Sequence, residues 1–119
     1  MKGVRNLGAI GEEAAERWLR SRGMRIVGRN LRTRAGEIDV LALDGDTLVA
    51  VEVKARSGDG FGRPEEAVDR KRLDRLRRAT LAYATSRGLE GAPMRIDVVA
   101  VRLEGGRAAA CEHFPDVGS

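Results

Sequence analysis

Cysteine, histidine and aromatic residues are scarce in this chain of 119 residues. The single cysteine, Cys111, excludes a disulfide within the chain and a thiolate metal cage, and it fits a reducing compartment. We expect Cys111 to be a small apolar residue of the last strand. The only histidine, His113, lies near the C-terminal end, where we expect a surface residue and not a general base. Because few aromatic side chains are present, the core must consist of Val, Leu, Ile and Ala.

Long apolar runs are also missing. No stretch is long enough to span a bilayer, and no apolar segment of a signal peptide follows the basic start Met1–Arg5. We therefore expect a cytoplasmic protein that does not contact a membrane. No repeat, linker or break in composition divides the chain, so we expect one domain over residues 1–119. Its core should cover about residues 5–114, followed by a frayed tail at residues 115–119.

Charge is abundant and unevenly distributed. Charged residues make up 34% of the chain, the net charge is +4, and basic residues cluster in the first third and between residues 70 and 78. Such clusters suit a phosphate backbone, although they also occur on the solvated face of a helix. The sequence therefore suggests a nucleic acid as partner, and the candidate phosphate contacts are Arg32, Arg34, Arg56, Lys71, Arg72 and Arg75.

The hydrophobic pattern predicts a small mixed β-sheet flanked by helices, an α/β or α+β fold in the order α-β-β-β-α-β-β. The first predicted elements are a helix over 7–21 and a short strand over 24–27, which residues 30–34 either continue or follow as a basic loop. After these come a hairpin of two strands over 38–43 and 47–54, a long helix from Pro64 to Gly88, a strand over 95–101 and an edge strand over 108–114. The long helix can act as a crossover, which would make the strand after it parallel to the strand before it.

The predicted hairpin carries charges on otherwise apolar strands. Side chains alternate along a strand, so Glu52 and Lys54 should share one face, and Asp39 should lie opposite Ile38 and Val40. Pairing across the Asp44-Gly45-Asp46 turn would bring Asp39 close to Glu52 and Lys54. Two adjacent carboxylates suit a hard cation such as Mg²⁺ or Mn²⁺, and Lys54 would then stand next to metal-bound water. The alternative is the polar face of a half-solvated hairpin.

Glu12 is a further candidate ligand, from the first predicted helix. It falls at the edge of the apolar stripe, at i, i+3 and i+7 with Ala15 and Leu19. Gly8 and Gly11 precede it and would allow another backbone to come close. An inward carboxylate at this position would complete a metal site with Asp39 and Glu52. Alternatively, Glu12 is an acidic residue that the positive end of the helix dipole favours.

Together these motifs resemble the YraN family of inferred endonucleases over about residues 5 to 103. The resemblance rests on Gly8-x-x-Gly11-Glu12, Asn30-x-Arg32-x-x-x-Gly36-Glu37-Ile38-Asp39, Val51-Glu52-Val53-Lys54, Phe61-Gly62 with Glu66-Ala67-Val68, Lys71 and Arg95-Ile96-Asp97-Val98-Val99. It implies a minimal PD-(D/E)xK nuclease with the restriction-endonuclease-like core that archaeal Holliday-junction resolvases also have.

The resemblance also implies roles for particular residues. Asp39, Glu52 and Lys54 match the Asp…Glu-x-Lys signature, Glu12 matches the acid on the first helix, and Lys71 matches a lysine that touches phosphate. We therefore expect a Mg²⁺- or Mn²⁺-dependent nuclease acting on DNA, with branched or structured DNA among the candidate substrates. The alternative is a non-enzymatic module that binds nucleic acid or acts as a scaffold. A homodimer would suit a cutter of duplexes or junctions, although no residue requires one.

Overall fold

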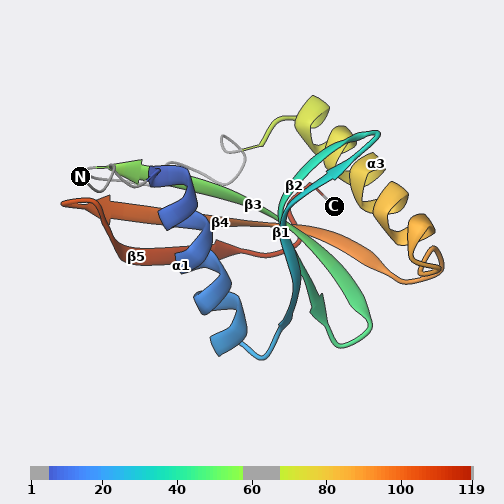
Figure 1. Cartoon of the computed structure of the whole chain (residues 1–119), viewed down its shortest axis with the longest axis horizontal. Helices are drawn as coiled ribbons and strands as arrows, with labels where there is room; N and C mark the ends of the chain where they lie inside the picture. Colours follow the sequence, from blue (N-terminus) through green and yellow to red (C-terminus); the bar gives the residue numbers. More distant parts are fainter. Residues whose placement is uncertain (1–5, 58–67, 119) are drawn as a thin grey trace.

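The elements follow one another in the predicted order. The computed structural model describes residues 6–57 and 68–118 (Figure 1). The elements within these ranges are α1 (Leu7–Ser21), β1 (Arg25–Thr33), β2 (Gly36–Asp44), β3 (Thr47–Ser57), α3 (Arg70–Ser86), β4 (Met94–Glu104) and β5 (Arg107–Phe114). The fold is a mixed α+β arrangement, as predicted, and is consistent with a nuclease-like fold.

The strands form one sheet in the order β1-β2-β3-β4-β5. Neighbouring strands are antiparallel except β3 and β4, which are parallel and joined through α3. The crossover role predicted for the long helix is therefore confirmed, and β5 is an edge strand as expected. The tight turn between β2 and β3 closes at Asp44 and Thr47, where Gly45 has a φ of 62° that favours glycine.

Helices α1 and α3 cover opposite faces of the sheet and create two separate cores (Figure 1). The α1-side core contains Leu19 of α1 with Val49 and Val51 of β3. The α3-side core contains Leu76 of α3 with Leu48 and Ala50 of the same strand. This alternation follows from the two-residue period of a strand, and it leaves β3 buried on both faces from Leu48 to Glu52.

Helix α3 begins later than the sequence suggests. Asp69 caps it, because the Asp69 Oδ1 accepts a hydrogen bond of 2.8 Å from the Arg72 N–H, and α3 starts at Arg70. The predicted start at Pro64 lies outside the described residues, and residues 68 and 69 are not helical. The expected uninterrupted helix is therefore wrong. Leu81 of this helix is 45% exposed.

The first strand continues to Thr33, as one of the two predicted alternatives had it, and it contains a residue of unusual backbone conformation. Asn30 has a φ of 52°, a left-handed conformation that asparagine tolerates better than most residues. Arg29 pairs with Val40 and Leu31 pairs with Ile38, so Asn30 lies opposite Asp39. The alternation of faces is also broken here on β2: Ile38 lies in the α3-side core, whereas Val40, two residues later, lies in the α1-side core. The expectation that Ile38 and Val40 share one face is therefore wrong.

Residues 115–118 are held against the sheet, whereas the sequence predicted a frayed tail. The Val117 N–H donates to the Ile96 carbonyl oxygen at 2.8 Å, and the Asp116 N–H donates to Asp97 Oδ1 at 2.9 Å. His113 is also not the surface residue that the sequence suggested. Its side chain is only 14% exposed, and its Nε2 lies 2.8 Å from Asp97 Oδ2. Neither described helix, α1 or α3, has the length and apolar character needed to cross a membrane.

Candidate functional site

The candidate site forms where β2 and β3 part. Their paired residues run from Asp44 and Thr47 to Val40 and Val51, and the next position on β2 is Asp39. At this position the Asp39 side chain connects the two strands, because its Oδ2 accepts a hydrogen bond of 3.0 Å from the Val53 N–H. Val53 lies between Glu52 and Lys54. The predicted proximity of Asp39 to the Glu-x-Lys segment is therefore present in the structure.

Glu52 and Lys54 lie on the face of β3 that α3 covers. Glu52 is buried, and Lys54 Nζ lies 3.5 Å from its Oε2. Arg72, in the first turn of α3, holds the same carboxylate at two points: its Nε donates to Oε2 at 3.2 Å and its Nη2 donates to Oε1 at 2.8 Å. This bidentate contact fixes the Glu52 side chain and raises the pKa of Arg72.

Glu12 reaches the same region from α1, on the other face of the sheet. Its Oε1 accepts a hydrogen bond of 3.0 Å from Asn30 Nδ2, and Asn30 is the residue opposite Asp39. Gly11 permits the approach of α1, because a Cβ at this position would lie 2.9 Å from the Ala55 Cβ on β3. The expected close approach is thus present at Gly11. A Cβ on Gly8 would lie 3.1 Å from Oδ1 of Asn6, the cap of its own helix, with no other described residue within 4 Å.

The electrostatics of Asp39 show that these groups act on one another. Burial raises the pKa of Asp39 to about 6, against the hydrogen bond from Val53 that lowers it. The negative charges of Glu52 and Glu12 contribute to this rise in the pKa, whereas the positive charge of Arg72 opposes it. Contributions from α1, β3 and α3 therefore meet at one carboxylate of β2.

The chemistry of these carboxylates suits a hard divalent cation, but their present arrangement does not hold one. Asp39, Glu52 and Glu12 offer the oxygen ligands that Mg²⁺ and Mn²⁺ prefer. Within residues 6–57 and 68–118, however, no three His, Cys, Asp or Glu side chains are grouped so that they could hold one ion. In the structure each of the three carboxylates has another partner: Val53 for Asp39, Arg72 for Glu52 and Asn30 for Glu12.

The residues predicted to contact phosphate fall into two groups. Lys71 and Arg75 on α3, Arg32 on β1, Arg34 in the turn after β1 and Arg56 at the end of β3 are all exposed. Arg72 differs from them, because its guanidinium lies against Glu52. The structure thus leaves five of the six predicted cations accessible to an anion, and it gives the sixth a different contact.

A second polar cluster surrounds Asp97 on β4. This buried carboxylate accepts hydrogen bonds from Arg95 Nε at 3.0 Å and from the Asp116 N–H at 2.9 Å, and it also contacts His113. Burial alone would raise the pKa of Asp97, but these contacts lower it. The Asp97 carboxylate thus joins Arg95 on its own strand to the backbone of the C-terminal segment.

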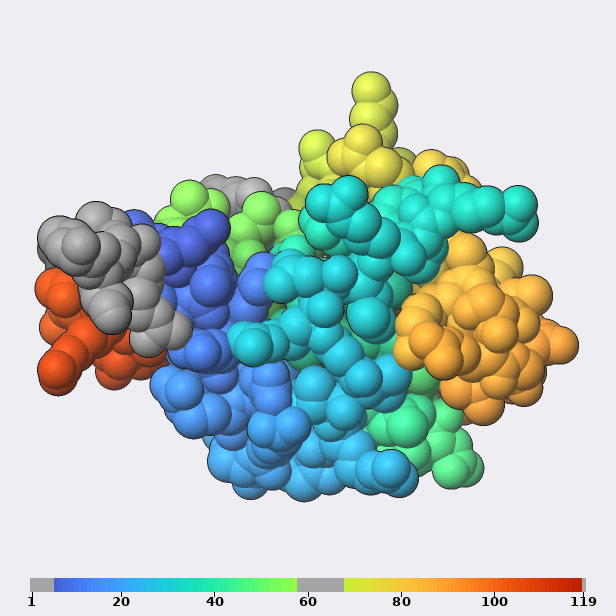
Figure 2. All heavy atoms as spheres, viewed as in Figure 1, coloured from blue at the N-terminus to red at the C-terminus, as the bar shows by residue number. Residues whose placement is uncertain are grey.

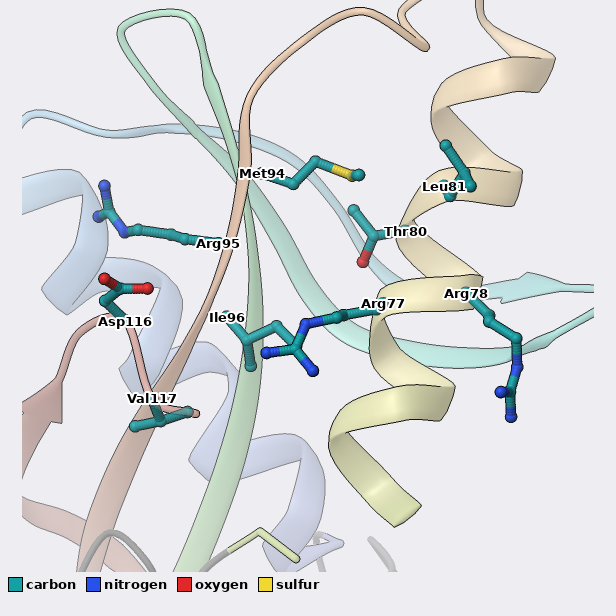
Figure 3. Close-up of a pocket in the computed structure, with 9 residues that line it drawn as sticks. All are labelled: Arg77, Arg78, Thr80, Leu81, Met94, Arg95, Ile96, Asp116 and Val117. Atoms are coloured by element: carbon teal, nitrogen blue, oxygen red, sulfur yellow. The ribbon is translucent and has the colours of Figure 1, made fainter. Parts of the chain in front are cut away.

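A cavity of about 320 Å³ lies beside this cluster, between α3 and the start of β4 (Figure 3). None of Glu12, Asp39, Glu52 and Lys54 lines it. Two of its arginines are engaged within the protein: Arg77 Nη2 donates to the Gly118 carbonyl oxygen at 2.9 Å, and Arg95 contacts Asp44 and Asp97. The cavity therefore lies apart from the carboxylate cluster. Of its three arginines, only Arg78 has no ion pair within the described residues.

Two residues of the site were not predicted as such. Asn30 was recognised only as part of a motif, although an asparagine within a strand could have signalled a left-handed residue. Arg72 was predicted to contact phosphate because it lies in a basic run. Its pairing with Glu52 depends on how α3 packs on the sheet, and no local pattern encodes that.

The fold and the site define a class of proteins: a small mixed α+β domain with carboxylates gathered where two central strands part. Comparison with known families assigns the chain to one of them. Residues 11–101 match the model described as uncharacterised protein family UPF0102, and the chain belongs to this family, which is the YraN family.

Similar proteins come from diverse bacteria. A UPF0102 protein of Beutenbergia cavernae is 47% identical over 112 residues, covering 94% of this chain and 95% of the relative. One from Pelotomaculum thermopropionicum is 43% identical and covers 91% of each chain. One from Moorella thermoacetica is 48% identical over 84% of this chain and 83% of its own. The likeness therefore extends over nearly the whole domain.

Proposed function

We propose that this protein is a metal-dependent nuclease that hydrolyses phosphodiester bonds in DNA. The observation that supports the proposal is the meeting of Asp39, Glu52 and Lys54 around the Val53 N–H, with Glu12 acting on the same carboxylate from α1. Carboxylates and a lysine at one point, beside a helix rich in exposed basic residues, suit the chemistry of phosphate transfer. The resemblance to PD-(D/E)xK nucleases points to the same reaction.

Asp39, Glu52 and Glu12 would hold Mg²⁺ or Mn²⁺, which when bound would supply a positive charge that polarises the scissile phosphate. Hydrolysis adds water across the P–O bond, placing the hydroxyl on phosphorus and the proton on the leaving sugar oxygen. Lys54 is partly exposed and lies 3.5 Å from Glu52. Its ammonium can orient the attacking water or offset the negative charge that develops on the phosphate.

Exposed basic residues of α3 would position the strand. Lys71 and Arg75 flank Arg72 in sequence and are both open to solvent. Contacts of this kind fix the register of a nucleic acid without reading its bases. The proposal therefore places the backbone of the substrate along the first half of α3, with the scissile bond at Glu52.

The test is cleavage by the full chain in the presence of Mn²⁺. Labelled linear, flapped and four-way DNA should be cut by the wild type and left intact by Asp39→Ala. Asp46→Ala is a matched control, because Asp46 is an exposed acid in the turn of the same hairpin. EDTA should stop the wild type and the control alike. Equal behaviour of wild type and Asp39→Ala on every substrate would refute the enzymatic proposal.

A second candidate function is a nucleic-acid-binding module without catalysis. The pairing of Glu52 with Arg72 favours it, because the buried carboxylate already has a fixed positive partner. Under this alternative the acids are structural, and DNA binding weakens steeply with salt because bound phosphates release counterions.

Calorimetric titration with Mn²⁺ separates the two candidates. A metal-binding heat that Glu52→Gln abolishes supports the nuclease. DNA binding with no Mn²⁺ heat, in either the absence or the presence of DNA, supports the module.

A further inference from the structure

A second basic surface lies on the same helix as the candidate site but farther along it. It is a groove of about 740 Å³ between the second half of α3 and the end of β1 with the turn that follows. Both views place the β1–β2 turn beside α3 (Figures 1 and 2). We call it the arginine groove, because Arg32, Arg34, Arg78 and Arg87 line it.

The charge of the arginine groove is largely uncompensated. No acidic residue lines it. Within the described parts of the chain, no ion pair is found for Arg34 or Arg78, and Arg32 meets Glu37 only at 3.7 Å with both side chains well exposed. Arg78 extends from α3 on the side opposite to Arg77, which points toward Ile96 (Figure 3). These guanidinium groups are therefore free to bind an anion, preferably phosphate.

Flat and apolar side chains accompany these charges. Tyr83 lines the groove, and the Arg87 guanidinium lies over its ring, 5.0 Å from the centroid. Leu81, also in the lining, is 45% exposed. A positive groove with an aromatic ring is how proteins bind single-stranded nucleic acid, whose unpaired bases stack on such surfaces. The bases of an intact duplex are stacked on one another, so they cannot stack on an aromatic side chain of the protein.

A line of basic residues joins the groove to the candidate site. Lys71, Arg75 and Arg78 are exposed and spaced at i, i+4 and i+7, which places them on one side of α3. With a rise of 1.5 Å per residue, Arg78 lies about 9 Å and Tyr83 about 17 Å along the helix from Arg72. A strand that passes the candidate site can therefore continue into the arginine groove within a few nucleotides.

We propose that the arginine groove binds a single-stranded segment of DNA next to the bond that is cut. The inference rests on the proposed function and specifies its substrate class: DNA with an unpaired arm or overhang beside the scissile bond. Arg34 and Arg78 bind its phosphates, and Tyr83 with Arg87 stacks against a base.

The test is binding of fluorescent oligonucleotides by the full chain in EDTA, so that no cleavage is needed. The probes are a single strand, a blunt duplex and duplexes with a 3′ or a 5′ overhang. The variant is the double substitution Arg34→Ala/Arg78→Ala. Arg25→Ala/Arg107→Ala is the control, because it removes the same charge from exposed residues that do not line the groove. Thermal unfolding checks that each variant is folded.

We expect the Arg34→Ala/Arg78→Ala variant to bind single-stranded and overhang DNA about tenfold more weakly than the control variant, and blunt duplex almost equally well. The slope of log affinity against log salt for single strands should fall by about 1.4, or 0.7 for each lost phosphate contact. Tyr83→Leu should weaken binding of single strands roughly tenfold without changing that slope.

Three results would overturn the inference. One is equal binding of overhang DNA by the two double variants. Another is an equal loss for blunt duplex and overhang DNA. The third is binding of a poly-glutamate peptide as tight as that of the single strand and equally weakened by Arg34→Ala/Arg78→Ala, which would indicate an acidic protein partner.

Failure of the groove and failure of the proposed function give different results. If Mn²⁺-dependent cleavage by the wild type is found but both double variants bind overhang DNA alike, only the groove assignment fails. If the groove variant loses overhang binding but no substrate is ever cleaved, the nuclease proposal fails and the single-strand site stands.

Discussion

The guanidinium of Arg72 and the carboxylate of Glu52 form a bidentate pair, with contacts of 3.2 and 2.8 Å, at the centre of the candidate site. Glu52 is 5% exposed, so its charge requires a partner. Arg72 occupies the position from which a divalent cation would compensate the same charge. A metal that uses Glu52 must therefore compete with Arg72.

Removal of Arg72 should accordingly strengthen metal binding. A hydrogen bond to a charged group contributes about 1.5–3 kcal/mol, so Arg72→Ala should raise the Mn²⁺ affinity at least about tenfold. Without metal, the variant should unfold at a lower temperature, because Glu52 loses its main partner while remaining buried. The measurements are calorimetric Mn²⁺ titration and the rise in Tm that Mn²⁺ produces.

Arg75→Ala is the matched control for this prediction. Arg75 lies on the same helix and carries the same charge, but it is exposed and has no ion pair within the described residues. If Arg72→Ala and Arg75→Ala respond to Mn²⁺ alike, Arg72 does not compete with the metal.

Asp39 should make stability depend on pH in an unusual direction. Its pKa is about 6 in the fold and 3.8 ordinarily, so the folded state holds a proton that the unfolded state releases. Stability from this group is therefore present below pH 3.8 and is lost as the pH rises through about 6. Asp39→Asn keeps an oxygen for the Val53 N–H but carries no charge. In EDTA, its Tm should match the wild type near pH 4 and exceed it above pH 6. A Tm difference that does not change with pH would contradict the shift.

Asp97 should behave in the opposite way. Its contacts with His113, Arg95 and the Asp116 N–H lower its pKa, so its charge stabilises the fold above the ordinary pKa of 3.8 and this stabilisation is lost on acidification. At pH 7, Asp97→Asn should reduce the free energy of unfolding by about 1.5–3 kcal/mol, because the hydrogen bond from Arg95 to a charged carboxylate is lost. Urea denaturation measures it, with Asp46→Asn as an exposed control. A loss as small as that of the control would show that the cluster does not stabilise the fold.

Gly11 should be intolerant of a side chain. Glycine to alanine within a helix normally gains about 0.5–1 kcal/mol, but a Cβ here would lie 2.9 Å from the Ala55 Cβ. Overpacking of this kind costs about 1–3 kcal/mol, so Gly11→Ala should lower the Tm. The double variant Gly11→Ala/Ala55→Gly removes the clash and should recover part of the loss. A Tm of Gly11→Ala at or above that of the wild type would show that α1 can shift without cost.

Much of the hairpin could be predicted because its geometry is local. The turn at Asp44-Gly45-Asp46 sets which residues of β2 and β3 face each other, and this brings Asp39 to the Glu52–Lys54 segment. The burial of His113 could not be predicted in this way. It depends on Asp97, which lies on a neighbouring strand 16 residues away in sequence.

The sequence by itself determined the order of the elements, the parallel crossover through α3 and the neighbourhood of Asp39, Glu52 and Lys54. These follow from periodicity and turn chemistry within short stretches of chain. Only the tertiary structure decided that Arg72 turns inward to Glu52, that Asn30 connects Glu12 to the strand beside Asp39, and that Arg34 and Arg78 share one groove. Each of these relationships joins different elements, so it depends on how helices and strands pack and not on the sequence around any one residue.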